Sequence, residues 1–338
     1  MHMHDLNFSF IIPVFNRPDE IKELIDSLSK QEFDKSFEVV IVEDGSTISS
    51  EKVIEEFKDK LQISYYQKKN SGPGDSRNYG MQRAKGNYFI VLDSDCIIPP
   101  QYLAEAEKEL QKEFVHCYGG PDAAHESFST VQKAINYVMT SLFTTGGIRG
   151  NKKALDKFQP RSFNMGISKK AFEATQGFGN IHPGEDPDLT FRIWKADYTT
   201  RLFPEAYVYH KRRIDWSKFY KQVNKFGMVR PILNKWHPNT KKLTYWFPAL
   251  FIFGLLISIL FSFFDFSWPL WCYGVYFSLL FIDAFLKTRN ITIAFLAIFA
   301  TFIQFIGYGW GFLKSTFLLN FSNKKAEEIF PGLFFTKN

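Results

Sequence analysis

The side chains of this sequence best suited to chemistry are two aspartates one residue apart, Asp93 and Asp95, which directly follow the apolar run Tyr88–Leu92. A short continuous apolar run is typical of a buried strand, so both carboxylates would leave the end of one strand. Two carboxylates this close repel one another unless a metal ion or hydrogen-bond donors neutralise their charge. A turn on the protein surface would also account for the pair, and the pattern alone leaves both interpretations open.

Other motifs accompany this pair in a fixed order along the chain. Before it stand the segments 11–17 (IIPVFNR), 42–46 (VEDGS) and 72–80 (GPGDSRNYG), and after it come 164–168 (NMGIS), 177–178 (GF) and 184–189 (GEDPDL). The ordered set resembles glycosyltransferase family 2, the inverting nucleotide-sugar transferases of the GT-A fold, over roughly residues 7–210. The whole set is far more specific than any single motif in it.

The resemblance implies a nucleoside-diphosphate sugar as donor and a divalent metal as cofactor. The leaving diphosphate gathers negative charge in the transition state, which a cation stabilises. In the resembled family the last aspartate of the motif, here Asp95, binds the metal, while Asp93 lies toward the ribose with Ser94 beside it. Oxygen ligands suit Mg²⁺ or Mn²⁺, and the sequence does not choose between them. His210 stands where GT-A enzymes often supply a third metal contact, although a lone histidine can equally be structural.

The resemblance also assigns residues to the nucleoside. Asp44 matches the carboxylate that recognises the nucleoside in that family, and Glu43 stands where an aspartate is more usual. Pro13, Phe15 and Asn16 would form the wall under the base. A simple turn after the second strand is the alternative, since aspartate and glycine are good turn residues.

Arg77 begins a predicted helix after Gly72-Pro73-Gly74. Its guanidinium could meet the donor phosphate or the aspartates of the metal motif, because a helix N-terminus and an arginine both favour anions. An ordinary surface ion pair is the competing interpretation.

The acidic run at 185–188 is the candidate for the bond-forming step. A hydroxyl is a poor nucleophile, so inverting transfer needs a carboxylate opposite the leaving diphosphate to take its proton. The resemblance assigns this general base to Asp186, with Glu185 orienting the acceptor and Asp188 in the same run. Acidic residues also suit the first turn of the helix predicted there, which is compatible with the catalytic role.

Hydrophobic periodicity predicts the elements that position these residues. Strands are expected at Phe8–Val14, Phe37–Val42, Ile63–Tyr66, Tyr88–Leu92 and Tyr207–Tyr209, with helices from Pro18, from Glu51 and over Gly74–Ala84. Repeated strand–helix units indicate an α/β fold with a mostly parallel, Rossmann-like sheet of GT-A type. Ligands of such sheets bind at the carboxyl ends of the strands, which is where the motifs fall. Donor selectivity depends on loops such as Gly119–Gly150, so the sequence identifies neither base nor sugar.

The composition of the 338-residue chain changes near Tyr245, and the part from Trp246 to about Leu319 is dominated by Phe, Leu and Ile. Three stretches, Trp246–Phe264, Trp268–Leu286 and Ile291–Leu313, approach the ~20 residues that a helix needs to cross a bilayer. The third contains Gln304 and three glycines, so a re-entrant or interfacial helix is its alternative. The predicted organisation is a GT-A domain at 1–213, a juxtamembrane segment at 214–245, a membrane region of two to three helices at 246–320 and a tail at 321–338.

The juxtamembrane segment is basic and rich in aromatic residues, which predicts a helix on an anionic inner leaflet. Nucleic acid would be bound by similar residues, but the adjacent apolar stretches argue against such a partner. Processive members of the resembled family carry a Q-x-x-R-W motif in this region, and Gln222–Phe226 departs from it. That departure argues against processive polymer synthesis.

Topology follows from charge. Lys287 and Arg289 follow the second stretch, whereas the loop Asp265–Ser267 has no basic residue, which places the N-terminal domain inside. No signal peptide is expected from the polar start Met1–Asp5, and three cysteines without ligand spacing suit a reducing cytosol. The protein is therefore expected in the cytoplasmic (inner) membrane, multi-pass, with its catalytic domain on the cytoplasmic side.

Together these features predict a membrane-anchored inverting glycosyltransferase that transfers a sugar to a lipid-linked or other glycan acceptor. A processive polysaccharide synthase and a catalytically inert membrane scaffold of the same fold are the alternatives, and a nucleotidyltransferase is a more distant one. Asp93, Asp95 and Asp186 are all present, which an inert scaffold would not need.

Overall fold

The computed structural model describes residues 6–123, 128–146, 158–210 and 215–335. The chain forms two compact units. Unit 1 contains residues 1–125, 152–211 and 334–338, and unit 2 contains residues 126–151 and 212–333. The polar start Met1–Asp5 lies outside the described residues.

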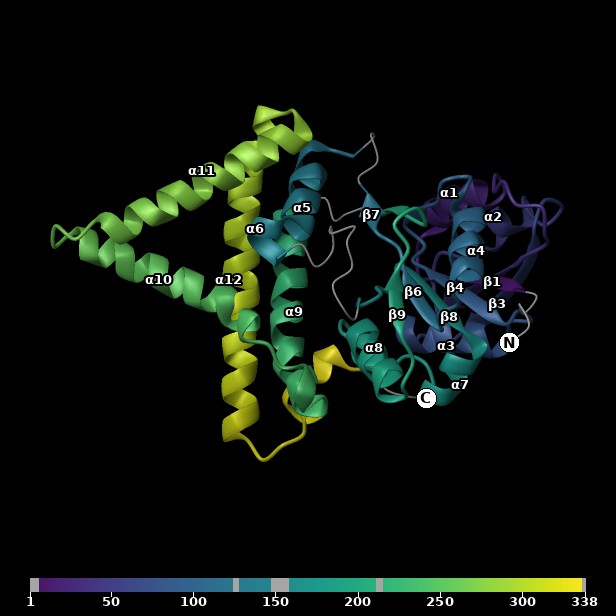
Figure 1. The fold of residues 1–338 in the computed structure, drawn as a ribbon. Helices are drawn as coiled ribbons and strands as arrows, with labels where there is room; N and C mark the ends of the chain where they lie inside the picture. The colour runs from purple at the N-terminus through teal and green to yellow at the C-terminus, as the bar shows by residue number, and fades with distance from the viewer. Residues whose placement is uncertain (1–5, 124–127, 147–157, 211–214, 336–338) are drawn as a thin grey trace. The chain divides into compact units, whose positions relative to one another are not determined.

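Unit 1 is built on a seven-stranded sheet in the order β3-β2-β1-β4-β8-β6-β9 (Figure 1). Strands β3, β2, β1 and β4 run parallel, and β8 is antiparallel to its neighbours β4 and β6. The mostly parallel sheet predicted from the sequence is thereby confirmed. The strands are β1 (Phe8–Val14), β2 (Glu38–Asp44), β3 (Gln62–Lys68), β4 (Tyr88–Leu92), β6 (Cys117–Gly119), β8 (Asn164–Ser168) and β9 (Thr200–Leu202).

Helices cover both faces of this sheet, which explains why its central strands are continuously apolar. One face packs on α1 (Pro18–Leu28), α2 (Glu51–Glu55) and α4 (Tyr102–Lys112). The other packs on α3 (Pro73–Arg83), α7 (Lys169–Thr175) and α8 (Glu185–Lys195). Alternate residues of β1 serve the two layers, with Phe10 and Ile12 in one core and Ile11 in the other.

A small second sheet brings distant residues together. It consists of β5 (Cys96–Ile97), β10 (Val208–His210) and β7 (Asp122–Ala123), with β10 in the middle. Strand β10 lies one residue later than the sequence predicts, and its last residue, His210, pairs with Cys96. The register therefore places His210 beside the end of the Asp-x-Asp motif.

The segment that follows unit 2 in the chain returns to unit 1. Phe334 forms an isolated antiparallel bridge with Ile181, and the Phe335 amide donates a hydrogen bond of 3.0 Å to the Asn180 carbonyl. Sequence reasoning treated this segment only as a tail.

Unit 2 is helical. Its elements are α5 (Thr130–Thr140), α6 (Leu142–Thr145), α9 (Trp216–Trp236), α10 (Phe247–Ser262), α11 (Trp268–Thr288), α12 (Ile291–Phe321), α13 (Ala326–Ile329) and the 3-10 turns η1 (Pro238–Thr240), η2 (Leu243–Trp246) and η3 (Pro331–Leu333). Within the described ranges, three helical segments are long and apolar enough to cross a membrane: 243–262, 268–288 and 291–321. The region 119–150, treated as a loop in the sequence analysis, contains β7, α5 and α6 in its described part.

Helices α9 and α12 lie side by side in unit 2 (Figure 1). A Cβ at Gly227 would lie 2.1 Å from the Tyr308 carbonyl oxygen, and one at Gly311 would lie 2.2 Å from that of Asn224. The Asn224 amide donates to the Gly307 carbonyl at 2.9 Å. The glycines of the third apolar stretch thus form a close helix–helix contact, as small residues do between membrane helices.

Candidate functional site

Three parallel strands end at the candidate site. The turn after β1 contains Phe15, whose side chain is half exposed, and Asn16, which has a positive φ of 54°. The Asn16 side-chain oxygen accepts hydrogen bonds from the amides of Thr47 at 2.8 Å and Ile48 at 3.0 Å. These bonds join the loops that follow β1 and β2. Asparagine tolerates this backbone conformation better than most residues do. Pro13 pairs in register with Val42 of β2.

Glu43 and Asp44, at the end of β2, are both buried and bonded to their own surroundings. Glu43 accepts hydrogen bonds from the Ser50 amide and the Tyr65 hydroxyl, each at 2.9 Å. This carboxylate holds the loop before α2. These bonds favour a structural role for Glu43 over a direct contact with a nucleotide.

Asp44 holds the loop in front of α3. Its oxygens accept from the amides of Ser71 at 3.0 Å and Gly72 at 2.9 Å, and Lys68 Nζ lies 2.7 Å away. These three donors hold the carboxylate in place and fix the turn that precedes Arg77.

Arg77 is the centre of the site's ion-pair network. Its Nη2 lies 2.7 Å from Asp93 Oδ1, and its Nη1 lies 3.1 Å from Glu185 Oε1. The side chain is only 3% exposed, so this is not a surface ion pair. Burial would lower the pKa of Arg77, but the two carboxylates outweigh it and raise the pKa. The Arg77 guanidinium thus joins the metal motif to the acidic run of α8.

Glu185 has a second partner, His182, whose Nδ1 lies 3.0 Å from the same carboxylate oxygen. Burial would raise the pKa of Glu185, but the charges of His182 and Arg77 outweigh it and lower the pKa to about 2. The pKa of His182 is raised: burial lowers it, and the charge of Glu185 more than compensates. Glu185 Oε2 is buried and makes no hydrogen bond among the described residues.

Asp186 differs from its two acidic neighbours. Arg161 Nη1 lies 3.4 Å from Asp186 Oδ2, a longer and less exclusive contact than those of Glu185. Asp188 instead meets Arg192 of its own helix twice, at 2.8 and 3.0 Å. The three carboxylates of this run thus meet three different arginines, Arg77, Arg161 and Arg192.

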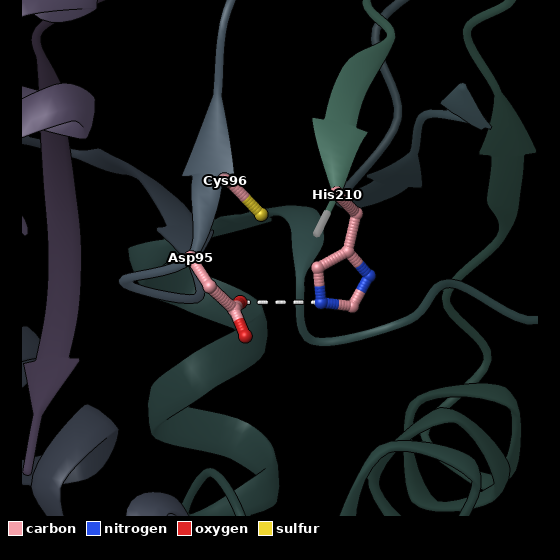
Figure 2. A group of neighbouring side chains, drawn as sticks. All are labelled: Asp95, Cys96 and His210. Carbon is pink, nitrogen blue, oxygen red and sulfur yellow. Dashed lines mark ion pairs between the residues drawn. The ribbon is translucent and has the colours of Figure 1, made fainter. Parts of the chain in front are cut away.

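Asp95 and His210 face one another across the small sheet (Figure 2). His210 Nε2 lies 3.2 Å from Asp95 Oδ1, and Arg17 Nη1 lies 2.6 Å from Asp95 Oδ2. Burial would raise the pKa of Asp95, but His210 and Arg17 outweigh it and hold the pKa well below its ordinary value. Ser94, between the two aspartates, is buried.

The donor set of this pair fits a divalent metal. Ligand atoms of Asp95, Cys96 and His210 lie within 4.8 Å of one another. The Cys96 thiol is buried in the core and donates to the Phe163 carbonyl at 3.5 Å, which leaves a carboxylate oxygen and an imidazole nitrogen as the natural ligands. Such a set suits Mn²⁺ and admits Mg²⁺. Arg17 offsets part of the negative charge at the same carboxylate.

Several residues of this site carry no recognisable sequence signal. Arg17 stands inside the first motif, yet only the fold shows that it reaches Asp95. His182 stands three residues before Glu185 but outside the motifs, and Arg161 lies far in sequence from Asp186. Phe335 lies against His182 with ring centroids 6.0 Å apart, and a Cβ at Gly72 would lie 2.4 Å from its ring. No local pattern could have indicated a contact over such a sequence separation.

Comparison with known proteins agrees with this geometry. Residues 9–175 match the family described as glycosyl transferase family 2. Poly(ribitol-phosphate) beta-N-acetylglucosaminyltransferase TarS of Staphylococcus aureus is 38% identical over 104 residues, which cover 30% of this chain and 18% of TarS. Glycosyltransferase GlyA of Streptococcus pneumoniae is 33% identical over 107 residues, covering 31% and 15%. The alignments thus span less than a fifth of either relative.

Solved structures share the fold over most of the chain. The crystal structure of S. aureus TarS 1-349 superposes with a TM-score of 0.52 at 19% identity, covering 94% of this chain and 93% of that one. The mannosyltransferase PcManGT from Pyrobaculum calidifontis, in complex with GDP-Man and Mn²⁺, gives a TM-score of 0.57 at 13% identity, with coverages of 95% and 89%. At these identities the likeness shows a common GT-A-type fold.

Proposed function

We propose that this chain, whose residues 9–175 match glycosyl transferase family 2, transfers a sugar, with inversion, from a nucleoside-diphosphate donor to a hydroxyl of a membrane-linked acceptor. The observation that carries the proposal is the buried Arg77, which joins Asp93 of the metal motif to Glu185, the neighbour of Asp186. The Arg77 side chain therefore links the part of the site that would hold the donor to the part that would hold the acceptor.

In this proposal Asp186 is the general base. It takes the proton of the acceptor hydroxyl as that oxygen bonds to the anomeric carbon, and the carbon–oxygen bond to the diphosphate breaks with its electron pair on the leaving phosphate. Glu185 is held ionised by Arg77 and His182, so it orients the acceptor and is a poor candidate for taking the proton. A divalent cation held by Asp95 and His210 would neutralise charge on the diphosphate.

Other residues of the site would bind the nucleotide-sugar donor. Asp93 remains about a third exposed and lies toward the ribose, while Phe15 and Pro13 line the nucleoside. Asp44 acts through its loop, since its bonds to Ser71 and Gly72 shape the turn against which the nucleotide would lie. An N-acetylglucosamine donor is the first candidate, because TarS is named for that sugar. Its acceptor, a poly(ribitol-phosphate), makes polyol-phosphate chains an acceptor class beside lipid-linked glycans.

We place the protein in the cytoplasmic membrane with unit 1 on the cytoplasmic side. Large apolar side chains such as Phe253 of α10 and Trp271 of α11 are more than half exposed, which suits contact with lipid. Lys287 and Arg289 after α11, against the base-free loop after α10, support the orientation.

A panel of nucleotide sugars separates this function from an inert scaffold. Purified full-length protein is incubated with each donor and Mn²⁺ or Mg²⁺, and released nucleoside diphosphate is measured with and without membrane extract as acceptor. Release from one donor that Asp186→Asn abolishes and the surface control Asp26→Asn preserves is the expected result. Absence of release from every donor, with metal and acceptor present, contradicts the proposal. Growth of product length on a single acceptor would instead identify a processive synthase.

A further inference from the structure

A pocket of about 300 Å³ lies in unit 2 where the end of α12 meets α9 and the segment 324–327. Its apolar wall includes Trp236 and Leu319. Its polar side chains are Lys235, Lys324, Lys325 and Glu327. Three ammonium groups against one carboxylate leave the pocket with a net positive charge.

The lysines of this pocket are held in two different ways. Lys235 donates from Nζ to the Leu319 carbonyl near the end of α12, so its charge is anchored at the wall. Lys324 and Lys325 are exposed and follow directly on the end of the helix. A ligand bound by Lys324 and Lys325 beside the charge of Lys235 must be anionic, and the apolar wall favours one with a hydrocarbon part.

We propose that this pocket binds the phosphate headgroup of an anionic membrane lipid. Basic side chains beside an apolar helix attract such lipids, and tryptophan is common at the level of the headgroups. The occupant would fix the end of α12 and the following loop at the membrane surface. The proposal rests on the membrane anchoring proposed above.

Trp236 supplies a reporter at the pocket. The full-length protein in detergent micelles is titrated with phosphatidylglycerol or phosphatidylcholine carrying brominated acyl chains, which quench nearby tryptophans. We expect phosphatidylglycerol to quench more strongly at equal mole fraction, and Trp236→Phe to remove the excess. Lys324→Gln with Lys325→Gln should weaken the phosphatidylglycerol response by about fivefold per lysine. The matched control replaces Lys58 and Lys60, two exposed lysines of unit 1, by glutamine and should change nothing.

Three outcomes overturn the proposal. Equal quenching by both lipids would show that the pocket does not select anionic headgroups. An unchanged response of the Lys324 and Lys325 variant would place the binding elsewhere. Loss of the excess in millimolar inorganic phosphate would assign the pocket to a free anion. Failure of the membrane anchoring itself would look different, because the protein would then stay soluble without detergent and neither lipid would quench its tryptophans.

Discussion

The guanidinium of Arg77 donates a hydrogen bond of 2.7 Å to the Asp93 carboxylate from a position that is almost fully buried. Because Asp93 directly follows β4 and Arg77 lies in α3, the helix before that strand, this bond fixes the metal motif against α3. The same guanidinium reaches Glu185, so the motif and α8 are held by one side chain.

Removal of this cation should destabilise the catalytic unit. Arg77→Met would leave Glu185 with one partner fewer in a buried position, and breaking a buried ion pair typically costs about 3–5 kcal/mol. We expect a loss of that order in the free energy of unfolding, read from thermal or urea melts of the full-length protein. Arg83→Met in the same helix, whose guanidinium lies over the Tyr79 ring at 3.3 Å from its centroid, is the control. Similar melts for the two variants would show that the Arg77 network contributes little.

Asp186→Asn should affect chemistry rather than donor binding. Loss of general-base assistance typically lowers the rate by ~10² to 10⁴, and a base that takes the acceptor's proton needs no contact with the diphosphate. We therefore expect kcat to fall by about that factor while calorimetry with nucleoside diphosphate and metal shows nearly unchanged affinity. Parallel loss of nucleotide binding would move the base to another residue. Glu185→Gln differs because it also removes a partner of Arg77 and His182, and its melting temperature should fall as well.

Metal dependence should follow Asp95 and His210. Asp95→Asn removes a charged ligand, and we expect it to abolish the part of nucleotide affinity that Mn²⁺ adds in calorimetry. His210→Gln should weaken that part without abolishing it, because the carboxylate remains. Full wild-type turnover in excess EDTA would contradict the metal assignment of both residues.

The His182–Glu185 pair predicts a pH dependence of stability. The raised pKa of His182 means that its contribution is present below about pH 6.5 and is lost as the pH rises through the folded-state pKa. The lowered pKa of Glu185 means that its contribution is present above about pH 4.3 and is lost as the pH falls toward about 2. Wild type should therefore exceed His182→Gln in melting temperature more at pH 6 than at pH 8.5.

His116 offers a control of opposite sign. Burial lowers the pKa of His116, so its neutral form is the one that the fold favours. The deficit of His116→Gln should grow, not shrink, as the pH rises from 6 to 8.5. A deficit of His182→Gln that is independent of pH would show that its ion pair does not form.

The parts of this molecule that sequence reasoning recovered are those encoded locally. Strand Tyr88–Leu92, a continuous apolar run, was predicted with both ends correct. The helix predicted at Gly74–Ala84 lies one residue earlier, with Pro73 as its first residue. The three long apolar helices begin at or within one residue of their predicted starts, Trp246, Trp268 and Ile291. The third is longer than predicted and runs on to Phe321.

The parts that escaped are contacts between distant segments. The family resemblance alone suggested that His210 lies near Asp95, because β5 and β7 of the small sheet are strands of two residues, too short for any period to be read. The assignment of 126–151 to unit 2 depends on packing such as the Tyr137 hydroxyl on Asp283, 2.7 Å away. The sequence of a segment predicts neither which strand a short strand pairs with nor which element a helix packs against.

The bridge between Phe334 and Ile181 constrains how the chain can thread a bilayer. Unit 1 contains residues on both flanks of the long apolar helices, so a chain that leaves it for the membrane must come back to the side from which it left. In the membrane-anchored protein proposed above, the number of crossings would then be even, so the three apolar helices would not all cross the bilayer. Helix α12 is the best candidate for the helix that does not cross, because 44% of its apolar 18-residue stretch is buried in protein. The corresponding shares are 17% and 11% for the segments 243–262 and 268–288. The proposed anchor would then be a hairpin of α10 and α11, with α12 as an apolar helix that does not cross.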